Sequence, residues 1–179
     1  MTIAKETHQL PQQPFETLVE MHRDEIFAYL WRLIPGDQAE DCLQETFLRA
    51  FRAYKRTTPD SNYRAWLYKI ATNVARTAHT RLNREMTREL HSPEAPEQRT
   101  LMDTVTFRDD LKVVLQAVET LPHKQRAALM MRKYQEMDYK DIGAALECSP
   151  GTARAHVYQA LKKLRVRLVG DVERSMEAE

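Results

Sequence analysis

The spacing of apolar residues is the feature that most constrains the fold of this chain. Apolar side chains recur at intervals of three and four, and runs that alternate apolar with polar residues are absent. A spacing of three and four places apolar side chains on one face of an α-helix. Glycine, which weakens helices, occurs only 4 times in 179 residues. The sequence therefore predicts an all-α protein.

Three helices are predicted in the N-terminal half. The first begins at Phe15 and is ended by Pro35 and Gly36. The second runs from about residue 37 to 54, and the third from about 63 to 87. Between them, KRTTPDSN (residues 55–62) has the composition of a loop, with Pro59 and Asp60 as turn residues. The predicted inner faces comprise Phe15, Leu18, Val19, His22, Ile26, Phe27 and Leu30, then Leu43, Phe47, Ala50, Phe51 and Tyr54, then Trp66, Leu67, Ile70, Val74 and Ala78.

A proline- and glutamate-rich stretch divides the chain. HSPEAPEQRT, residues 91–100, has no apolar periodicity, which is typical of a linker. We therefore expect two small helical domains, at residues 15–87 and 107–172, joined by a flexible linker at 88–106. Residues 1–14 are expected to form a flexible arm and residues 173–179 a flexible tail. The second domain should begin with a helix that buries Leu111, Val114, Leu115 and Val118, followed by helices near 123–134, 138–147 and 150–169.

Composition argues against several classes of protein. No apolar run approaches the roughly 18 residues of a membrane span, and the N-terminus lacks the pattern of a secretory signal. The only two cysteines, Cys42 and Cys148, show no CxxC spacing, which favours a reducing cytoplasm. Cys148 and His156 form the nearest approach to a zinc site, but two ligands do not complete a tetrahedron. We therefore expect a cytoplasmic protein with no membrane insertion, no metal and no cofactor.

The distribution of charge is more informative than the net charge of +1. Two segments, residues 61–84 and 150–169, are basic and contain no acid. One basic helix in each domain is typical of a protein that contacts DNA at two points. The basic residues are Arg64, Lys69, Arg76, Arg81 and Arg84 in the first segment, and Arg154, Lys162, Lys163, Arg165 and Arg167 in the second.

The C-terminal segment DYKDIGAALECSPGTARAHVYQALKKLRVRL predicts a helix-turn-helix. A short helix is expected to bury Ile142, Ala145 and Leu146, and the small pair Gly143 and Ala144 should allow close helix contact. In the second helix, which is expected to end near Leu168, Ser149 is the predicted N-cap and Pro150 the first helical residue. Its predicted inner face is Ala153, Val157, Leu161, Leu164 and Leu168, and its exposed face is Thr152, Arg154, Ala155, Tyr158, Gln159, Lys162 and Lys163.

That exposed face suits DNA recognition. In the helix-turn-helix mode, residues near the N-terminus of the second helix meet base edges, and later lysines meet phosphates. Arg154 can contact guanine through two hydrogen bonds, and Gln159 can pair with adenine. The alternative is an amphipathic helix with a solvated basic face. The order of short helix, tight turn and long helix favours DNA binding.

A second surface lies in AEDCLQETFLRAFRAY, residues 39–54. Asp41, Gln44 and Glu45 share one exposed face at helical spacing. The chain offers no nucleophile or third ligand in register with these carboxylates, so we interpret the face as a protein-docking surface and expect no enzyme activity.

A third surface lies in residues 62–84, where aromatic and basic residues interleave without acids. Such a surface suits single-stranded or opening DNA, because bases stack on rings and the backbone meets cations. Trp66, at helical spacing with Ile70, is better explained as core than as a base platform. Asn73, Arg76 and Arg84 are less easily explained as core.

These stretches, in this order, resemble an extracytoplasmic-function sigma factor, the smallest type in the sigma-70 family of bacterial RNA polymerase sigma factors. AEDCLQETFLRAF is similar to sigma region 2.2, and AWLYKIATNVARTAHTR to regions 2.3 and 2.4. LPHKQRAALMMRKYQEMDYKDIGAALECSPGTARAHVYQALKKLR is similar to region 4.2. The resemblance covers residues 15 to about 169 and implies a region 2 bundle followed by a region 4 helix-turn-helix.

The resemblance implies an alternative sigma factor that binds core RNA polymerase, recognises the promoter −10 and −35 elements and helps melt the DNA. It implies docking of Asp41, Gln44 and Glu45 on the clamp helices of the largest subunit, a contact with the flap of the second-largest subunit, and inhibition by an anti-sigma factor. The implied −10 residues are Thr57, Asn62, Asn73, Arg76, Arg81 and Arg84, and the implied −35 residues are Thr152, Arg154, Ala155, Tyr158, Gln159, Lys162 and Lys163.

Three departures from the family pattern bear on specificity. Ala155 stands where serine is common, Gln159 stands where a basic residue is common, and the loop KRTTPDSN has no aromatic residue. The promoter bases therefore do not transfer from the family. Two other functions remain open from the residues: a sigma-like decoy that occupies an anti-sigma factor, and a stand-alone helix-turn-helix regulator. The acid-free basic helices disfavour the first, and the motifs at 39–84 disfavour the second.

Overall fold

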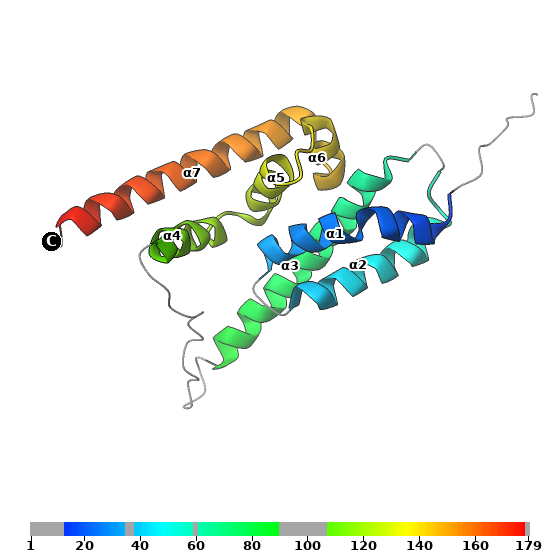
Figure 1. Cartoon of the computed structure of the whole chain (residues 1–179), viewed down its shortest axis with the longest axis horizontal. Coiled ribbons are helices and arrows are strands. Elements are labelled where there is room, and N and C mark those ends of the chain that lie inside the picture. Colours follow the sequence, from blue (N-terminus) through cyan, green and yellow to red (C-terminus); the bar gives the residue numbers. More distant parts are fainter. Residues whose placement is uncertain (1–12, 35–37, 59–60, 90–106, 178–179) are drawn as a thin grey trace, which may run out of the picture.

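The computed structural model describes residues 13–34, 38–58, 61–89 and 107–177, and within these ranges the chain forms seven α-helices and no strand. The all-α prediction is confirmed (Figure 1). The predicted turns at Pro35–Gly36 and Pro59–Asp60, residues 1–12 of the arm and the linker from residue 90 to 106 lie outside the described residues. The helices are α1 (Phe15–Leu33), α2 (Gln38–Tyr54), α3 (Tyr63–Glu89), α4 (Phe107–Glu119), α5 (His123–Lys133), α6 (Tyr139–Leu146) and α7 (Pro150–Glu177).

Helices α1, α2 and α3 form a bundle around two tyrosines. Tyr29 and Tyr68 are fully buried, and their rings meet edge to face with centroids 4.9 Å apart. Such a pair contributes about 0.5–1.5 kcal/mol beyond the area that it buries. The Tyr29 hydroxyl shares a hydrogen bond of 2.8 Å with Thr72 Oγ1, so these two buried hydroxyls are satisfied. Burial raises the pKa of Tyr29 and keeps its hydroxyl protonated.

Helices α5, α6 and α7 form the helix-turn-helix unit, and Gly143 explains its tight turn. A Cβ at this position would lie 2.7 Å from the carbonyl oxygen of Cys148, closer than real Cβ contacts allow. The same turn is closed by the Cys148 N–H, which donates to the Gly143 carbonyl at 2.9 Å. Ala144, which was expected to share the close contact, is exposed. Gly143 alone therefore permits the approach.

Helix α7 begins where the sequence predicts and ends later. It starts at Pro150, and the Thr152 N–H donates to Ser149 Oγ at 3.1 Å, which confirms Ser149 as the cap. Its end at Glu177 lies beyond the predicted end near Leu168 and inside the expected tail. Residues 165–177 contain one glycine and no proline, so no strong stop signal ends the helix earlier.

Four residues predicted to face inward are exposed instead. Phe51 and Leu161 are 57% and 42% exposed. The ring of Phe51 meets that of Phe15 of α1, with centroids 5.3 Å apart, but this single contact leaves most of the Phe51 side chain uncovered. Val114 and Leu115 are 37% and 54% exposed. Among its described side chains, α4 buries only those of its last turn, Ala117 and Val118.

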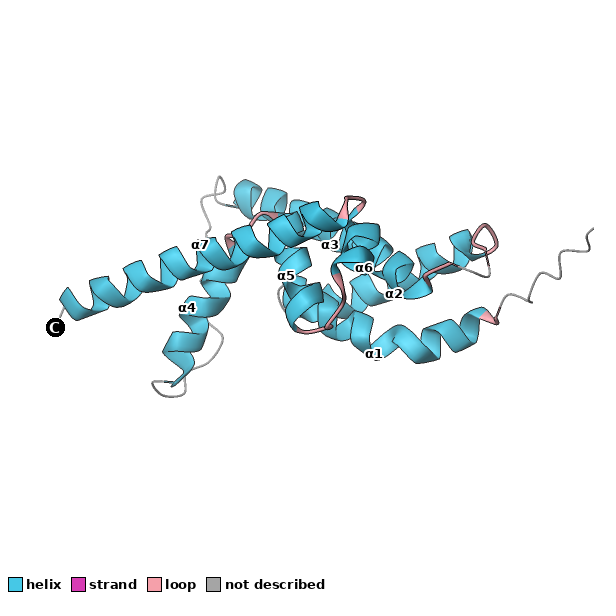
Figure 2. Ribbon diagram, turned by 90° about the horizontal axis from the view of Figure 1, so that it is seen from above, coloured by secondary structure: helices cyan, strands magenta, loops and turns pink. Residues whose placement is uncertain are grey.

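The two halves of the molecule pack directly against each other. Helix α3 lies along α6, and α1 contacts α5 (Figures 1 and 2). At this junction Arg126 of α5 is only 4% exposed, and Arg32 of α1 stacks on the ring of Tyr134, 4.5 Å from its centroid. The layout expected from the sequence, two domains joined by a linker, included no such contact.

Candidate nucleic-acid interface

One continuous face of the first half of α7 is exposed. All seven residues predicted for −35 contact are exposed, and Tyr158 is 64% exposed. Ala153, Val157 and Ala160 point the other way and are buried. The helix is therefore held by one side and presents the other, as a groove-binding helix requires. The exposed residues are Thr152, Arg154, Ala155, Tyr158, Gln159, Lys162 and Lys163.

Arg154 is oriented by an aromatic ring at the start of α6. Its guanidinium carbon lies 5.4 Å from the centroid of Tyr139, and Arg132 lies 5.0 Å from the same ring. An exposed cation–π contact is worth about 0.5–1 kcal/mol. Tyr139 therefore restricts Arg154 near the N-terminus of α7, where the helix dipole also favours an anionic partner.

The residues predicted for −10 contact are distributed over α3 and the loop before it. Arg76, Arg81 and Arg84 are exposed on α3, and Asn73 is half-buried. Thr57 Oγ1 donates to the Tyr54 carbonyl at 2.7 Å, which holds the start of the loop.

Asn62 has two structural partners in this state. Its Oδ1 accepts from the Ala65 N–H at 3.0 Å, which caps the N-terminus of α3. Its Nδ2 donates to Asp141 Oδ1 of α6 at 2.7 Å. The sequence predicted contact with DNA bases for this amide and did not predict the bond to α6, which joins residues 79 positions apart.

An aromatic residue lies directly after the loop, at the first position of α3. Tyr63 donates from its hydroxyl to the Thr58 carbonyl at 3.1 Å. Its ring lies 5.7 Å from that of Tyr54 and 6.4 Å from that of Trp66. Trp66 is half-buried and packs against the core, in line with its assignment to the core rather than to a base platform. Tyr63 of α3 therefore places an aromatic ring beside the loop, whose own sequence has none.

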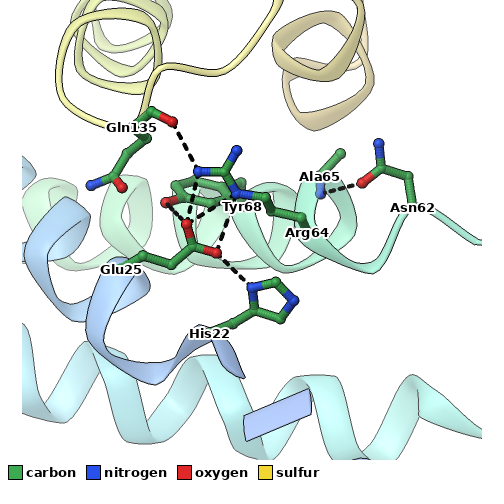
Figure 3. A network of polar contacts seen from close by, with 7 residues as sticks. All are labelled: His22, Glu25, Asn62, Arg64, Ala65, Tyr68 and Gln135. Atoms are coloured by element: carbon green, nitrogen blue, oxygen red, sulfur yellow. Dashed lines mark hydrogen bonds and ion pairs between the residues drawn. The ribbon is translucent and has the colours of Figure 1, made fainter. Parts of the chain in front are cut away.

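A polar network ties α1, α3 and the α5–α6 loop together (Figure 3). Arg64 donates to Glu25 Oε2 from Nη2 at 2.8 Å and from Nε at 3.0 Å, and its Nε also donates to Oε1 at 3.3 Å. The same Nη2 donates to the Gln135 carbonyl at 2.9 Å. His22 Nδ1 lies 2.5 Å from Glu25 Oε1. The charge pattern grouped Arg64 with the DNA-facing residues, but the structure uses it as a bridge.

The network keeps Glu25 ionised. Burial raises the pKa of Glu25, but the hydrogen bonds from His22 and Arg64 and their charges outweigh it, so the net pKa is lowered. The guanidinium of Arg64 makes a charge-assisted hydrogen bond to this half-buried carboxylate, which is stronger than a bond between neutral groups. Nothing in the local sequence indicates this site, because Glu25 and Arg64 are 39 residues apart.

A histidine at the junction of the two halves is held neutral. His123 of α5 lies 3.2 Å from the Thr72 carbonyl through its Nε2, which donates in the neutral form. Burial lowers the pKa of His123 to about 4, and the charge of Arg126 adds to the shift. Arg76 and His79 of α3 contribute in the same direction.

The predicted docking face on α2 continues into two exposed apolar side chains: Phe51, which the sequence predicted to face inward, and Leu48, for which it predicted no role. Asp41 and Gln44 are exposed, and Glu45 is half-buried and pairs with Arg49 at 2.6 Å. Leu48 and Phe51, which follow Gln44 by four and seven positions, are 51% and 57% exposed. Residues at these spacings share a helix face. The surface is therefore polar at one end and apolar at the other.

The described part of the chain contains no group of three or more His, Cys, Asp or Glu side chains arranged to hold a metal ion. None of its helices combines the length and apolarity needed to cross a membrane.

The chain is similar to known proteins in both halves. The family described as Sigma-70 region 2 matches residues 18–85, and that described as Sigma-70, region 4 matches residues 111–164. Among curated relatives, the ECF RNA polymerase sigma-E factor of Escherichia coli K12 is 26% identical over 159 residues, covering 83% of each chain. The RNA polymerase sigma-H factor of Pseudomonas aeruginosa is 28% identical over 165 residues, with the same coverage.

Solved structures share the fold. The sigma factor RpoE of Bartonella quintana, in complex with the anti-sigma factor NepR, superposes with a TM-score of 0.65 at 24% identity, covering 86% of this chain and 96% of that one. CnrH, in complex with the cytosolic domain of CnrY, superposes with a TM-score of 0.63 at 23% identity, covering 88% of each chain. The two family matches fall on the α1–α3 bundle and on the helix-turn-helix half and span more than half of the sequence, so this protein belongs to the sigma-70 family of RNA polymerase sigma factors, as a member of the extracytoplasmic-function type.

Proposed function

We propose that this protein is a dissociable subunit that directs core RNA polymerase to promoters carrying a −10 and a −35 element. The observation that carries the proposal is the presence, in one chain, of a region 2 bundle with an exposed docking face and a region 4 helix-turn-helix with an exposed basic face. The sigma-70 family consists of transcription initiation factors and is not a family of enzymes.

Recognition of the −35 element is assigned to the N-terminal half of α7. Arg154, positioned by Tyr139, is suited to a guanine, and Gln159 to an adenine. Lys162 and Lys163 follow one turn later, where phosphates flank the groove. Each well-placed base contact is worth about 1–3 kcal/mol of discrimination.

Recognition of the −10 element is assigned to α3 and its preceding loop. Unstacking a base costs a few kcal/mol, and this cost must be offset by contacts to the flipped base and to the backbone. Tyr63 provides an aromatic ring beside the loop, and Arg76, Arg81 and Arg84 provide exposed cations. Binding energy therefore drives strand opening, and no covalent chemistry is required.

Core docking is assigned to the α2 face formed by Asp41, Gln44, Leu48 and Phe51. Exposed apolar residues next to exposed polar ones are typical of a protein interface with a hydrophobic centre and a polar rim. The clamp helices of the largest polymerase subunit are the proposed partner, with the flap of the second-largest subunit as the partner of the helix-turn-helix half.

An anti-sigma factor is the proposed inhibitor. Support comes from the RpoE and CnrH structures, since NepR is described as an anti-sigma factor and each sigma-like chain was solved with a partner. No membrane-spanning helix is found in the described ranges, which is compatible with the cytoplasmic site of action that we propose.

Transcription by a reconstituted polymerase tests the proposal. The full-length protein is added to core RNA polymerase with a library of templates carrying random upstream sequence, and the transcribed templates are sequenced. We expect two enriched motifs at a fixed separation. Arg154→Ala should relax the base preference in the upstream motif, whereas Arg23→Ala, a matched change at an exposed arginine of α1, should not. Absence of both core binding and transcripts would contradict the proposal and leave the decoy and the stand-alone regulator as the alternatives.

A further inference from the structure

Arg126 of α5 is a buried cation without a counter-ion among the described residues. It is only 4% exposed, and its Nε has no hydrogen-bond partner. No ion pair joins its guanidinium to a carboxylate of the described chain. Arginine keeps its charge in proteins, so burial cannot be relieved by loss of the proton. Because a buried unpaired charge is costly, this guanidinium requires an anion that no described residue supplies.

The first turn of α5 lies beside this guanidinium. Side chains on a helix lean toward its N-terminus, so Arg126 extends over the turn that begins at His123. Pro122 precedes the helix without a side-chain cap, and the first turn contains no acidic residue. The N–H groups of His123 and Lys124 have no backbone acceptor among the described residues. This turn therefore keeps the partial positive charge of an uncapped helix start.

Helix α3 brings further nitrogen donors to the same place. His123 Nε2 lies 3.2 Å from the Thr72 carbonyl, which places the start of α5 against α3. Positions 72, 76 and 79 share a helix face, so Arg76 and His79 lie on the side of α3 that His123 meets. Arg76 is exposed and His79 is half-buried, so the cluster reaches the surface along α3.

The electrostatics of the cluster agree with this geometry. Burial, followed by the charge of Arg126, lowers the pKa of both His79 and His123. Glu119 of α4 and Tyr29 of α1 also face Arg126, and Glu119 acts on it at a distance, without an ion pair. Cationic groups from two helices thus repel one another here, and a bound anion would relieve that repulsion.

We propose that the Arg126 guanidinium, the first turn of α5 and His79 form a binding site for a small oxyanion of the phosphate or sulfate class. The planar guanidinium donates two parallel N–H groups, which match the oxygens of such an anion. The N–H groups of a helix start bind the same class of ligand. The site lies away from the exposed face of α7, and the inference does not depend on the proposed promoter function.

Thermal unfolding of the full chain tests the site, in sodium phosphate against sodium chloride at equal ionic strength and pH 7. Arg126→Met removes the guanidinium and keeps an apolar side chain of similar length. Arg23→Met, at an exposed arginine of α1, is the matched control with the same change in net charge. With about 10 mM phosphate and a Kd of about 1 mM, the ratio of folded to unfolded protein should rise about elevenfold.

That gain corresponds to a rise in Tm of about 3–5 °C for a chain of this size. We expect this rise in the wild type and in Arg23→Met, with saturation as phosphate increases, and no rise in Arg126→Met. In chloride, Arg126→Met should melt no lower than the wild type, because it removes an unpaired buried charge.

Histidine titration by NMR supplies a test that needs no variant. Sulfate is the probe, because it remains divalent throughout the acidic range of the titration. An anion beside His123 favours the imidazolium, so its pKa should rise from about 4 to about 5 or above when sulfate replaces chloride.

Either of two results would overturn the site. One is an equal phosphate effect on Tm in the wild type, Arg126→Met and Arg23→Met, which would be a general effect of the salt. The other is a set of histidine pKa values that sulfate leaves unchanged. The second result is decisive even if Arg126→Met does not fold, because it is measured on the wild-type chain.

Discussion

Replacing Gly143 with alanine tests the geometry of the helix-turn-helix most sharply. The new Cβ would lie 2.7 Å from the Cys148 carbonyl oxygen and 3.3 Å from the Pro150 nitrogen. Both atoms belong to the backbone of the turn, so the turn itself must move. Overpacking of this kind costs about 1–3 kcal/mol. The higher helix propensity of alanine returns up to about 1 kcal/mol, so we expect a net destabilisation of up to about 2 kcal/mol.

Gly151→Ala is the matched control, because it makes the same chemical change in the next helix. A Cβ there would meet only Ser149 Oγ, at 3.7 Å, which is ordinary van der Waals contact. The gain in helix propensity is common to both variants. The difference between their free energies of unfolding therefore measures the steric clash at position 143. We therefore expect Gly143→Ala to be about 1–3 kcal/mol less stable than Gly151→Ala.

Urea unfolding followed by circular dichroism measures both variants, with the free energy of unfolding taken by linear extrapolation. Affinity for duplex DNA containing the upstream motif should fall with stability for Gly143→Ala only. Equal unfolding free energies, within about 0.5 kcal/mol, would show that the turn accommodates a Cβ and that the account of Gly143 is mistaken.

Three further predictions concern docking, pH and the network at Arg64. Changing Asp41 and Gln44 together to lysine should weaken binding to core polymerase at least about tenfold with unchanged helicity; retained affinity would refute the docking assignment. In the folded protein the pKa of His123 is about 4, below the ordinary value of 6.5 that it has in the unfolded chain. The folded state therefore gains its full stability from neutral His123 above pH 6.5 and loses this stability as the pH falls toward 4. Discounted for the partial exposure of His123, the loss of stability between pH 7 and 5 should be about 1 kcal/mol. Urea unfolding at these two pH values should show that His123→Gln removes this part of the pH dependence; an identical pH dependence in the variant would contradict the role of His123. Glu25→Gln should destabilise the protein by about 1–3 kcal/mol at pH 7, because it leaves Arg64 without its carboxylate, and an unchanged urea midpoint would refute this role. The pKa of Glu25 is lowered, so the difference from wild type should shrink as acid protonates the carboxylate.

Local chemistry made the helix-turn-helix predictable from sequence. Ser149 and Pro150 mark the start of a helix through the cap and the fixed φ angle that their residue types provide, and the structure begins α7 there. The family resemblance also rests on stretches of this kind, in which spacing within one or two turns carries the information. The end of α7 was less predictable, since no strong stop signal follows Leu168.

Contacts between distant segments could not be predicted. Arg64 belongs to an acid-free basic stretch, and only the fold reveals that Glu25, 39 residues earlier, lies within reach of it. Asn62 and Asp141 are 79 residues apart, on two helices whose packing has no local signature. Phe51 was placed in the core because its spacing fits an apolar stripe, but spacing does not determine how wide a face the neighbouring helices cover.

We propose that this chain gives core RNA polymerase its promoter specificity. The decisive measurement is transcription by core polymerase with and without the purified protein on the random-promoter template library. We expect protein-dependent transcripts from templates that share two motifs at constant separation. Absence of both core binding and protein-dependent transcripts would contradict it.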